Sequence, residues 1–119
     1  PAYVMELDLR VLSQWYGKDR VFTPISKFDD EKRDFAFVVD KDITCEKIEN
    51  GIREACDYVS DVTLFDVYEG VQLPPNKKSM AYSVVFTPKN EELKAKKVEG
   101  FVKDILAHLK ETAGITLRG

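Results

Sequence analysis

The sequence predicts an α+β fold in which the elements follow the order strand, helix, strand, strand, helix, strand. Three observations support this prediction. Several short segments have apolar residues at every second position, which is typical of half-buried strands. Two other segments have apolar residues at steps of three and four, which is typical of amphipathic helices. With 119 residues, 44% hydrophobic and 33% charged, the chain has the size and composition of one compact domain.

A tail of residues 1–24 is predicted to precede a domain of residues 25–119, with Pro24 in the linker between them. In the tail, the segment YVMELDL of residues 3–9 alternates as a strand does. The segment after it is expected to add a helical turn or two that end at Gly17. The tail strand has no evident partner, and the chain begins without Met, so we expect it to be a piece of a longer protein.

The first core strand and the first core helix are predicted within residues 33–56. The segment RDFAFVVD has the alternation of a strand, and Thr44 is suited to cap a helix over CEKIENGIREAC, residues 45–56. That helix has one apolar stripe, which Gly51 weakens slightly. On the strand, one face consists of Phe35, Phe37 and Val39, and the other of Asp34, Ala36 and Val38.

The next two strands are separated by a loop. In the strand from about residue 62 to residue 68, Phe65 and Val67 are expected to face the helices. The opposite face then carries Leu64, Asp66 and Tyr68. The segment EGVQLPPNKK contains two prolines and an asparagine, which prevent regular structure. The following strand, SMAYSVVF, is expected to point Met80, Tyr82, Val84 and Phe86 inward.

The clearest element is the helix KKVEGFVKDILAHLKETAG, residues 96–114. Its apolar residues recur at steps of three and four, and Gly114 stands where a helix C-cap is expected. The segment ITLR, residues 115–118, is predicted to be the fourth strand. This order is the βαββαβ arrangement of ferredoxin-like folds. Because each helix has one apolar stripe, both should cover one face of a four-stranded antiparallel sheet and leave the other face open.

The open face is predicted to be small, hydrogen-bonding and partly aromatic. A floor of alanine and serine lets a flat ligand approach closely, a tyrosine can stack on a base, and an arginine can hold a phosphate or a base edge. A solvent-facing sheet also carries such residues without any ligand, so the pattern alone leaves both interpretations open. By alternation, the face consists of Ala36, Asp66, Tyr68, Ser79, Ala81, Ser83, Thr116 and Arg118.

The sequence lacks the residue sets that most catalytic and metal sites require. The one histidine, His108, lies in the amphipathic helix, and with Cys45 and Cys56 it cannot assemble a zinc site. There is no glycine-rich phosphate loop. The two cysteines lie too far apart along their helix for a disulfide, which suits free thiols in a reducing cytoplasm. No apolar run approaches the roughly 20 residues that span a bilayer.

The charge distribution argues against a strong general nucleic-acid binder. The formal net charge is −3, whereas such domains usually carry a basic excess. Residues 1–76 carry 9 Lys and Arg against 16 Asp and Glu, but residues 77–119 carry 9 against 5. A local basic surface near the C-terminal end is therefore compatible with the sequence.

Four segments in order resemble the ferredoxin-fold anticodon-binding domain at the C-terminus of bacterial phenylalanyl-tRNA synthetase beta subunits. The similarity covers about residues 25–119 and rests on FxxxxRDFAFVVD from Phe28, LFDVYEG, LPPNKKSMAYSVVF and the terminal LRG. The resemblance implies the same fold and a domain without catalysis or a cofactor of its own, which binds the anticodon stem-loop of tRNA(Phe). It also implies that the tail ends the preceding beta-subunit domain. The whole enzyme would be an alpha–beta heterotetramer that uses ATP and Mg²⁺ in the alpha subunit.

The resemblance also implies which residues contact RNA. Tyr68 would stack on an anticodon base, and Asp66 and Ser79 would read polar base edges. Arg118, with the nearby Lys77 and Lys78, would engage the RNA backbone or a base. The positions carried over from the family motifs are Ala36, Asp66, Tyr68, Ser79 and Arg118.

Two other functions remain open from the sequence. Small ferredoxin-like domains can pair and bind an amino acid between them, so a metabolite-sensing regulatory module is one alternative. The other is an interaction module without a ligand, which would dock through its strand edges or through the apolar tail. Binding of free amino acids rather than tRNA would favour the first alternative.

Overall fold

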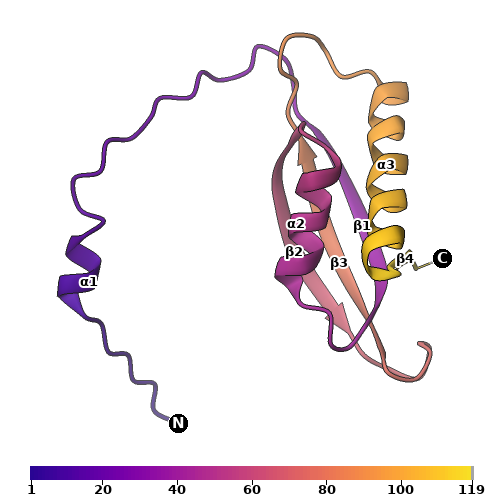
Figure 1. Ribbon diagram of the computed structural model, residues 1–119, viewed down its shortest axis with the longest axis horizontal. Coiled ribbons are helices and arrows are strands. Elements are labelled where there is room, and N and C mark those ends of the chain that lie inside the picture. Colours follow the sequence, from indigo (N-terminus) through magenta and orange to yellow (C-terminus); the bar gives the residue numbers. More distant parts are fainter. Residues whose placement is uncertain (119) are drawn as a thin grey trace.

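The computed structural model of the protein describes residues 1–118, so Gly119 of the LRG segment lies outside the described residues. Four strands form one antiparallel sheet in the order β2-β3-β1-β4, and α2 and α3 lie together on one face of it (Figure 1). The chain therefore has the predicted ferredoxin-like α+β fold. The elements are α1 Leu9–Ser13, β1 Glu31–Asp40, α2 Cys45–Ala55, β2 Val59–Tyr68, β3 Lys77–Phe86, α3 Ala95–Ala113 and β4 Thr116–Leu117.

The core lies between the sheet and the two helices. The inward residues of β1 and β3 pair directly, with Phe35 opposite Tyr82 and Phe37 opposite Met80, so their side chains share the helix-facing side. All four are buried. Helix α2 contributes Ile48 and Ile52 to this core, and α3 contributes Val98, Ile105 and Leu109. No helix within residues 1–118 covers the other face of the sheet.

Capping residues set the start of α2 and the end of α3. The Thr44 hydroxyl accepts a hydrogen bond from the Lys47 N–H at 3.3 Å and starts α2, as predicted. Helix α3 ends at Gly114, which has φ 63° and whose N–H donates to the Lys110 carbonyl at 3.0 Å. The left-handed conformation suits glycine and turns the chain directly into β4.

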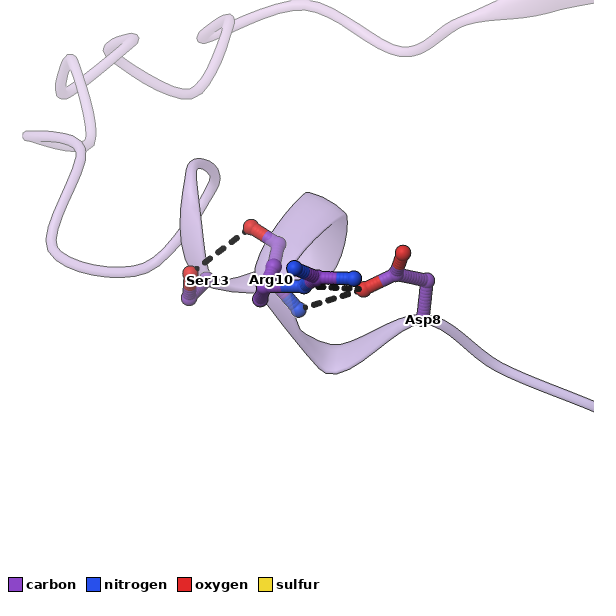
Figure 2. Close-up of polar contacts among 3 residues, drawn as sticks. All are labelled: Asp8, Arg10 and Ser13. Atoms are coloured by element: carbon purple, nitrogen blue, oxygen red, sulfur yellow. Dashed lines mark hydrogen bonds and ion pairs between the residues drawn. The ribbon is translucent and has the colours of Figure 1, made fainter.

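The N-terminal tail does not contain the predicted strand. Within residues 1–8 the chain is irregular, and the short α1 begins where the Asp8 carboxylate accepts from the Arg10 N–H at 2.8 Å (Figure 2). The Ser13 hydroxyl donates back to the Arg10 carbonyl. The tail runs away from the sheet (Figure 1), and its alternating residues meet no partner strand among the described residues. Alternation without a hydrogen-bonding partner does not make a strand.

The helices are too short or too polar to act as membrane spans. Among residues 1–118, none combines the length and the apolar character that crossing a bilayer requires.

Candidate functional site

The open face of the sheet has a floor of small side chains. Ala36 of β1 lies opposite Ala81 of β3, and Val38 lies opposite Ser79. Directly paired residues point to the same side, and these four alternate with the buried residues of both strands. Ser79 is buried although no helix covers it, because its neighbours surround its small side chain. A flat ligand could therefore approach the backbone of the two central strands closely.

A β-bulge positions the polar residues of β2. The register shifts between Leu64 and Asp66, so that Leu64 pairs with Tyr82 and Asp66 with Ala81. Before the shift Leu64 packs on the core, and after it Asp66 points to the open face. One extra residue, Phe65, is accommodated by the irregularity.

The bulge corrects two sequence predictions for β2. Phe65 was expected to face the helices, but it is 59% exposed and lines a hollow on the open face. Leu64 was expected on the open face and instead packs against the core. Val67 does lie on the helix side, opposite Met80, yet it remains about half exposed. The reason is that alternation counted back from Val67 assumes an unbroken ladder, whereas Phe65 is the extra residue of a bulge and the parity of the residues before it is reversed.

Two long side chains reach toward each other from opposite edges of this face. Tyr68 belongs to β2 at one edge, and Arg118 follows β4 at the other. The guanidinium carbon of Arg118 lies 5.2 Å from the centroid of the Tyr68 ring, which is a cation–π contact. The pair thus spans the two central strands, from the row of Ser79, which is opposite Tyr68, to the row of Ala36, which is bonded to Arg118.

Backbone and side-chain hydrogen bonds fix Arg118 in this position. Its N–H donates to the Ala36 carbonyl at 2.7 Å, which continues the pairing of β4 with β1 by one residue. Its guanidinium donates to Gln72 Oε1 at 3.4 Å. Gln72 belongs to the loop after β2, so this loop supports the same cation that Tyr68 contacts.

The two lysines of the predicted site diverge. Lys77 lies opposite Asp40 in the ladder, and its Nζ forms an ion pair with that carboxylate at 2.7 Å. Lys78 lies opposite Val39, which is a core residue, so Lys78 starts from the helix side of the sheet. The structure therefore brings Lys77 to the margin of the open face and leaves Lys78 on the other side. The other predicted RNA-contacting residues share the open face, and they are Ala36, Asp66, Tyr68, Ser79 and Arg118.

The chemistry of this face is that of a binding surface. It offers a phenol ring, a guanidinium, a carboxylate and small hydroxyl residues, which suit stacking and hydrogen bonding. His108 lies on α3, where its Nε2 is 3.4 Å from Glu54 Oε2 on α2, away from this face. Among residues 1–118, no cluster of three or more His, Cys, Asp or Glu side chains is arranged to hold a metal ion.

Sequence reasoning missed the roles of Phe65 and Gln72. The signal for Phe65 was present, because apolar residues occur at 62 and 64 and then at 65 and 67, so the alternation changes phase between Leu64 and Phe65. No local signal identifies Gln72 as a partner of Arg118, since the two residues are far apart in the chain.

The chain matches the family model of the ferredoxin-fold anticodon binding domain over residues 26–118. It is 36% identical over 118 residues to the phenylalanine–tRNA ligase beta subunit of Dehalococcoides mccartyi, and the aligned segment covers 99% of this chain and 14% of that protein. It is 35% identical to the same subunit of Clostridium acetobutylicum and 36% identical to that of Streptococcus pyogenes serotype M28, each over 98% of this chain and 15% of the relative. The chain therefore corresponds to a small part of these relatives.

Proposed function

We propose, from the premise that this chain belongs to the family of ferredoxin-fold anticodon binding domains, that its open sheet face recognises the anticodon stem-loop of tRNA(Phe). The observation that carries the proposal is the meeting of Tyr68 and Arg118 across the open face of the two central strands. An aromatic ring, a cation and a low floor on one exposed surface are what an unstacked base of an RNA loop requires.

Each residue of the proposed site has a role that follows from its chemistry. Tyr68 supplies the stacking surface for one base, and Asp66 accepts a hydrogen bond from an amino or imino group at the base edge. Ser79 is small enough to let the base lie flat and can hydrogen-bond to it. Arg118 contacts a phosphate or a second edge, and Lys77 adds positive charge at the margin of the surface.

The identity between the chain and its relatives supports a wider proposal about the whole protein. We propose that the domain is part of a phenylalanine–tRNA ligase beta subunit that assembles with alpha subunits in a cytoplasmic heterotetramer. The alpha subunit would use ATP and Mg²⁺ in the aminoacylation reaction, and this domain would hold the tRNA at a distance from that chemistry. The tail of residues 1–24 would be the end of the preceding beta-subunit domain, which agrees with its many exposed apolar side chains.

The electrostatics predict that this chain alone binds RNA weakly. With a formal net charge of −3 it releases few counterions, so most of the favourable electrostatic energy must come from other parts of the assembly. We expect a dissociation constant within the non-specific range, about 10⁻⁴ to 10⁻⁶ M.

The proposal can be tested by titrating the ¹⁵N-labelled chain with a tRNA(Phe) anticodon stem-loop. Chemical-shift changes are expected at Ala36, Asp66, Tyr68, Ser79 and Arg118. Tyr68→Ala should lower the affinity by about 1 to 3 kcal/mol, because it removes one stacking surface. Tyr16→Ala is a matched control, since Tyr16 is an exposed tyrosine of the tail. Changes confined to α2 and α3, or an unaltered affinity of the Tyr68→Ala variant, would contradict the proposal.

A further inference from the structure

The open face continues past the proposed anticodon site into the hollow that Phe65 lines, which has a volume of about 400 Å³. Its residues come from β1, β2 and β3, and the ladder shows how they are arranged. Thr63 lies opposite Ser83, which in turn lies opposite Asp34. Ser83 follows Ala81 by two residues on the same face of β3, so the hollow is the row of the sheet next to Ala81 and Ala36.

An exposed aromatic ring lines the hollow. Phe65 is 59% exposed, although a phenylalanine in a strand is normally packed against the core. The bulge between Leu64 and Asp66 is what directs this ring to the open face. Phe65 and Tyr68 therefore present two rings on the same face of one strand.

The polar groups of the hollow indicate a ligand that donates hydrogen bonds. Two carboxylates, Asp34 and Asp61, line it together with one cation, Lys32. The Thr63 hydroxyl donates to Asp61 Oδ2 at 2.8 Å, which holds that carboxylate in place. Ser83 is only 7% exposed, and its hydroxyl has no hydrogen-bond partner among the described residues.

These charges disfavour a phosphate and favour a nucleobase. Two negative charges against one positive charge repel a phosphate group, whereas carboxylates accept hydrogen bonds from the amino groups of bases. The flat, exposed ring of Phe65 matches the face of a base. A base would thus satisfy both the apolar and the polar parts of the hollow.

We propose that the hollow is a second nucleotide subsite, which stacks on Phe65 an RNA base adjacent in the loop to the base held by Tyr68. The inference rests on the proposed function, because it assigns a further base to the same RNA. It is supported by continuity, since the two subsites share the open face and the row of Asp66 and Ala81 in the proposed anticodon site lies next to the row of Ser83 in the hollow. Asp34 or Asp61 would accept a hydrogen bond from an exocyclic amino group of that base.

The test compares variants of the full 119-residue chain in titrations with the tRNA(Phe) anticodon stem-loop. Phe65→Ala should weaken binding about fivefold or more, because one stacking contact is lost. Phe65→Trp should restore it, since a larger ring still stacks. The matched control is Phe22→Ala, which removes an exposed phenylalanine from the tail. Thermal melting of each variant checks that the fold is intact.

A series of stem-loops, each with one abasic loop nucleotide, identifies the base. At the contacted position, the abasic RNA should bind wild type and Phe65→Ala equally, whereas other abasic positions should preserve the difference between the two proteins. Uridine at that position should bind more weakly than a base with an amino group.

The outcomes separate this inference from the proposed function. If Tyr68→Ala weakens binding and Phe65→Ala does not, the second subsite is wrong and the anticodon site stands. If Phe65→Ala weakens binding but the loss is the same for every abasic RNA, Phe65 does not stack on a particular base and the subsite is again wrong. If the wild-type chain binds no stem-loop, both proposals fail.

Discussion

The ring of Tyr68 occupies the space that a side chain at Gly70 would need. A Cβ built on Gly70 would lie 2.6 Å from Cζ of Tyr68, which is closer than non-bonded carbon atoms approach each other. Gly70 is therefore required for the position of the ring and not for an unusual backbone conformation. The contact connects the loop after β2 to the residue that stacks on RNA in the proposed function.

Gly70→Ala should reduce RNA binding without unfolding the domain. The new methyl group must displace the partly buried Tyr68 ring from its contact with Arg118, and this ring can turn outward into solvent. We expect a loss of affinity similar to that of Tyr68→Ala, about 1 to 3 kcal/mol, with a stability change below about 1 kcal/mol. Stem-loop titration and urea unfolding measure the two quantities. Full affinity in this variant would show that the position of the ring is unimportant.

Arg118→Ala should lower the salt dependence of RNA binding. If its guanidinium contacts a phosphate, the slope of the logarithm of affinity against the logarithm of salt concentration should decrease by somewhat less than one. Affinities at several salt concentrations provide the slope. Lys110→Ala is a suitable control, because Lys110 is an exposed cation of α3 on the helix side. An unchanged slope together with weaker binding would indicate that Arg118 contacts a base and not the backbone.

Two helical glycines should respond to alanine in opposite directions. Gly51 of α2 is buried, and a Cβ there would lie 2.7 Å from Cδ2 of Leu109, which is itself a core residue of α3. Gly51→Ala should destabilise the fold by about 1 to 3 kcal/mol through overpacking between the helices. Gly100→Ala meets nothing within 4 Å and should stabilise α3 by about 0.5 to 1 kcal/mol. Urea unfolding compares them, and equal effects would contradict this account of helix packing.

Tyr82 should make the fold sensitive to alkali. Burial raises the pKa of Tyr82 above its ordinary value near 10, and its hydroxyl has no hydrogen-bond partner among the described residues. Above about pH 10 the unfolded chain loses the phenolic proton that the folded chain retains, so the free energy of unfolding should fall as pH rises, by about 1.4 kcal/mol per unit. Below that pH the residue should make no pH-dependent contribution.

Tyr82→Phe should remove this part of the fall in the free energy of unfolding at alkaline pH. It should keep or increase the free energy of unfolding at pH 8, because no hydrogen bond is given up. Urea unfolding at pH 8 and pH 11 measures both effects. The same loss of stability between the two pH values in wild type and variant would rule out Tyr82 as its source.

The two thiols should differ in reactivity. Burial raises the pKa of the Cys56 thiol, and the nearby Asp57 carboxylate adds to this effect, whereas Cys45 is only partly buried. A thiol-specific reagent at pH 8 should therefore modify Cys45 first and Cys56 only slowly. Peptide mapping after timed labelling distinguishes the sites, and labelling in urea should abolish the difference. Faster modification of Cys56 in the native chain would contradict its burial.

The fold could largely be predicted from local patterns. Alternation in β1 and β3 and the helical spacing in α3 are direct consequences of one-sided burial, so the inward direction of Phe37 and Met80 follows once the strands are recognised. The tail strand was predicted by the same rule and is absent, because alternation expresses a tendency that only a partner strand can realise. Asp66 and Tyr68 do lie on the open face as predicted, but only because the bulge changes the phase of β2.

The amino-acid sequence by itself determined the order of the elements, the apolar faces and the resemblance to an RNA-binding family, since periodicity and short motifs are local properties. The tertiary structure decided which side chains from the two edges of the sheet come into contact. Tyr68 and Arg118 are separated by β3 and α3 in the chain, and they come together only because the sheet places β2 and β4 at its two edges and the floor between them is low. The exposure of Phe65 likewise depends on a ladder irregularity, which forms between strands and not within one.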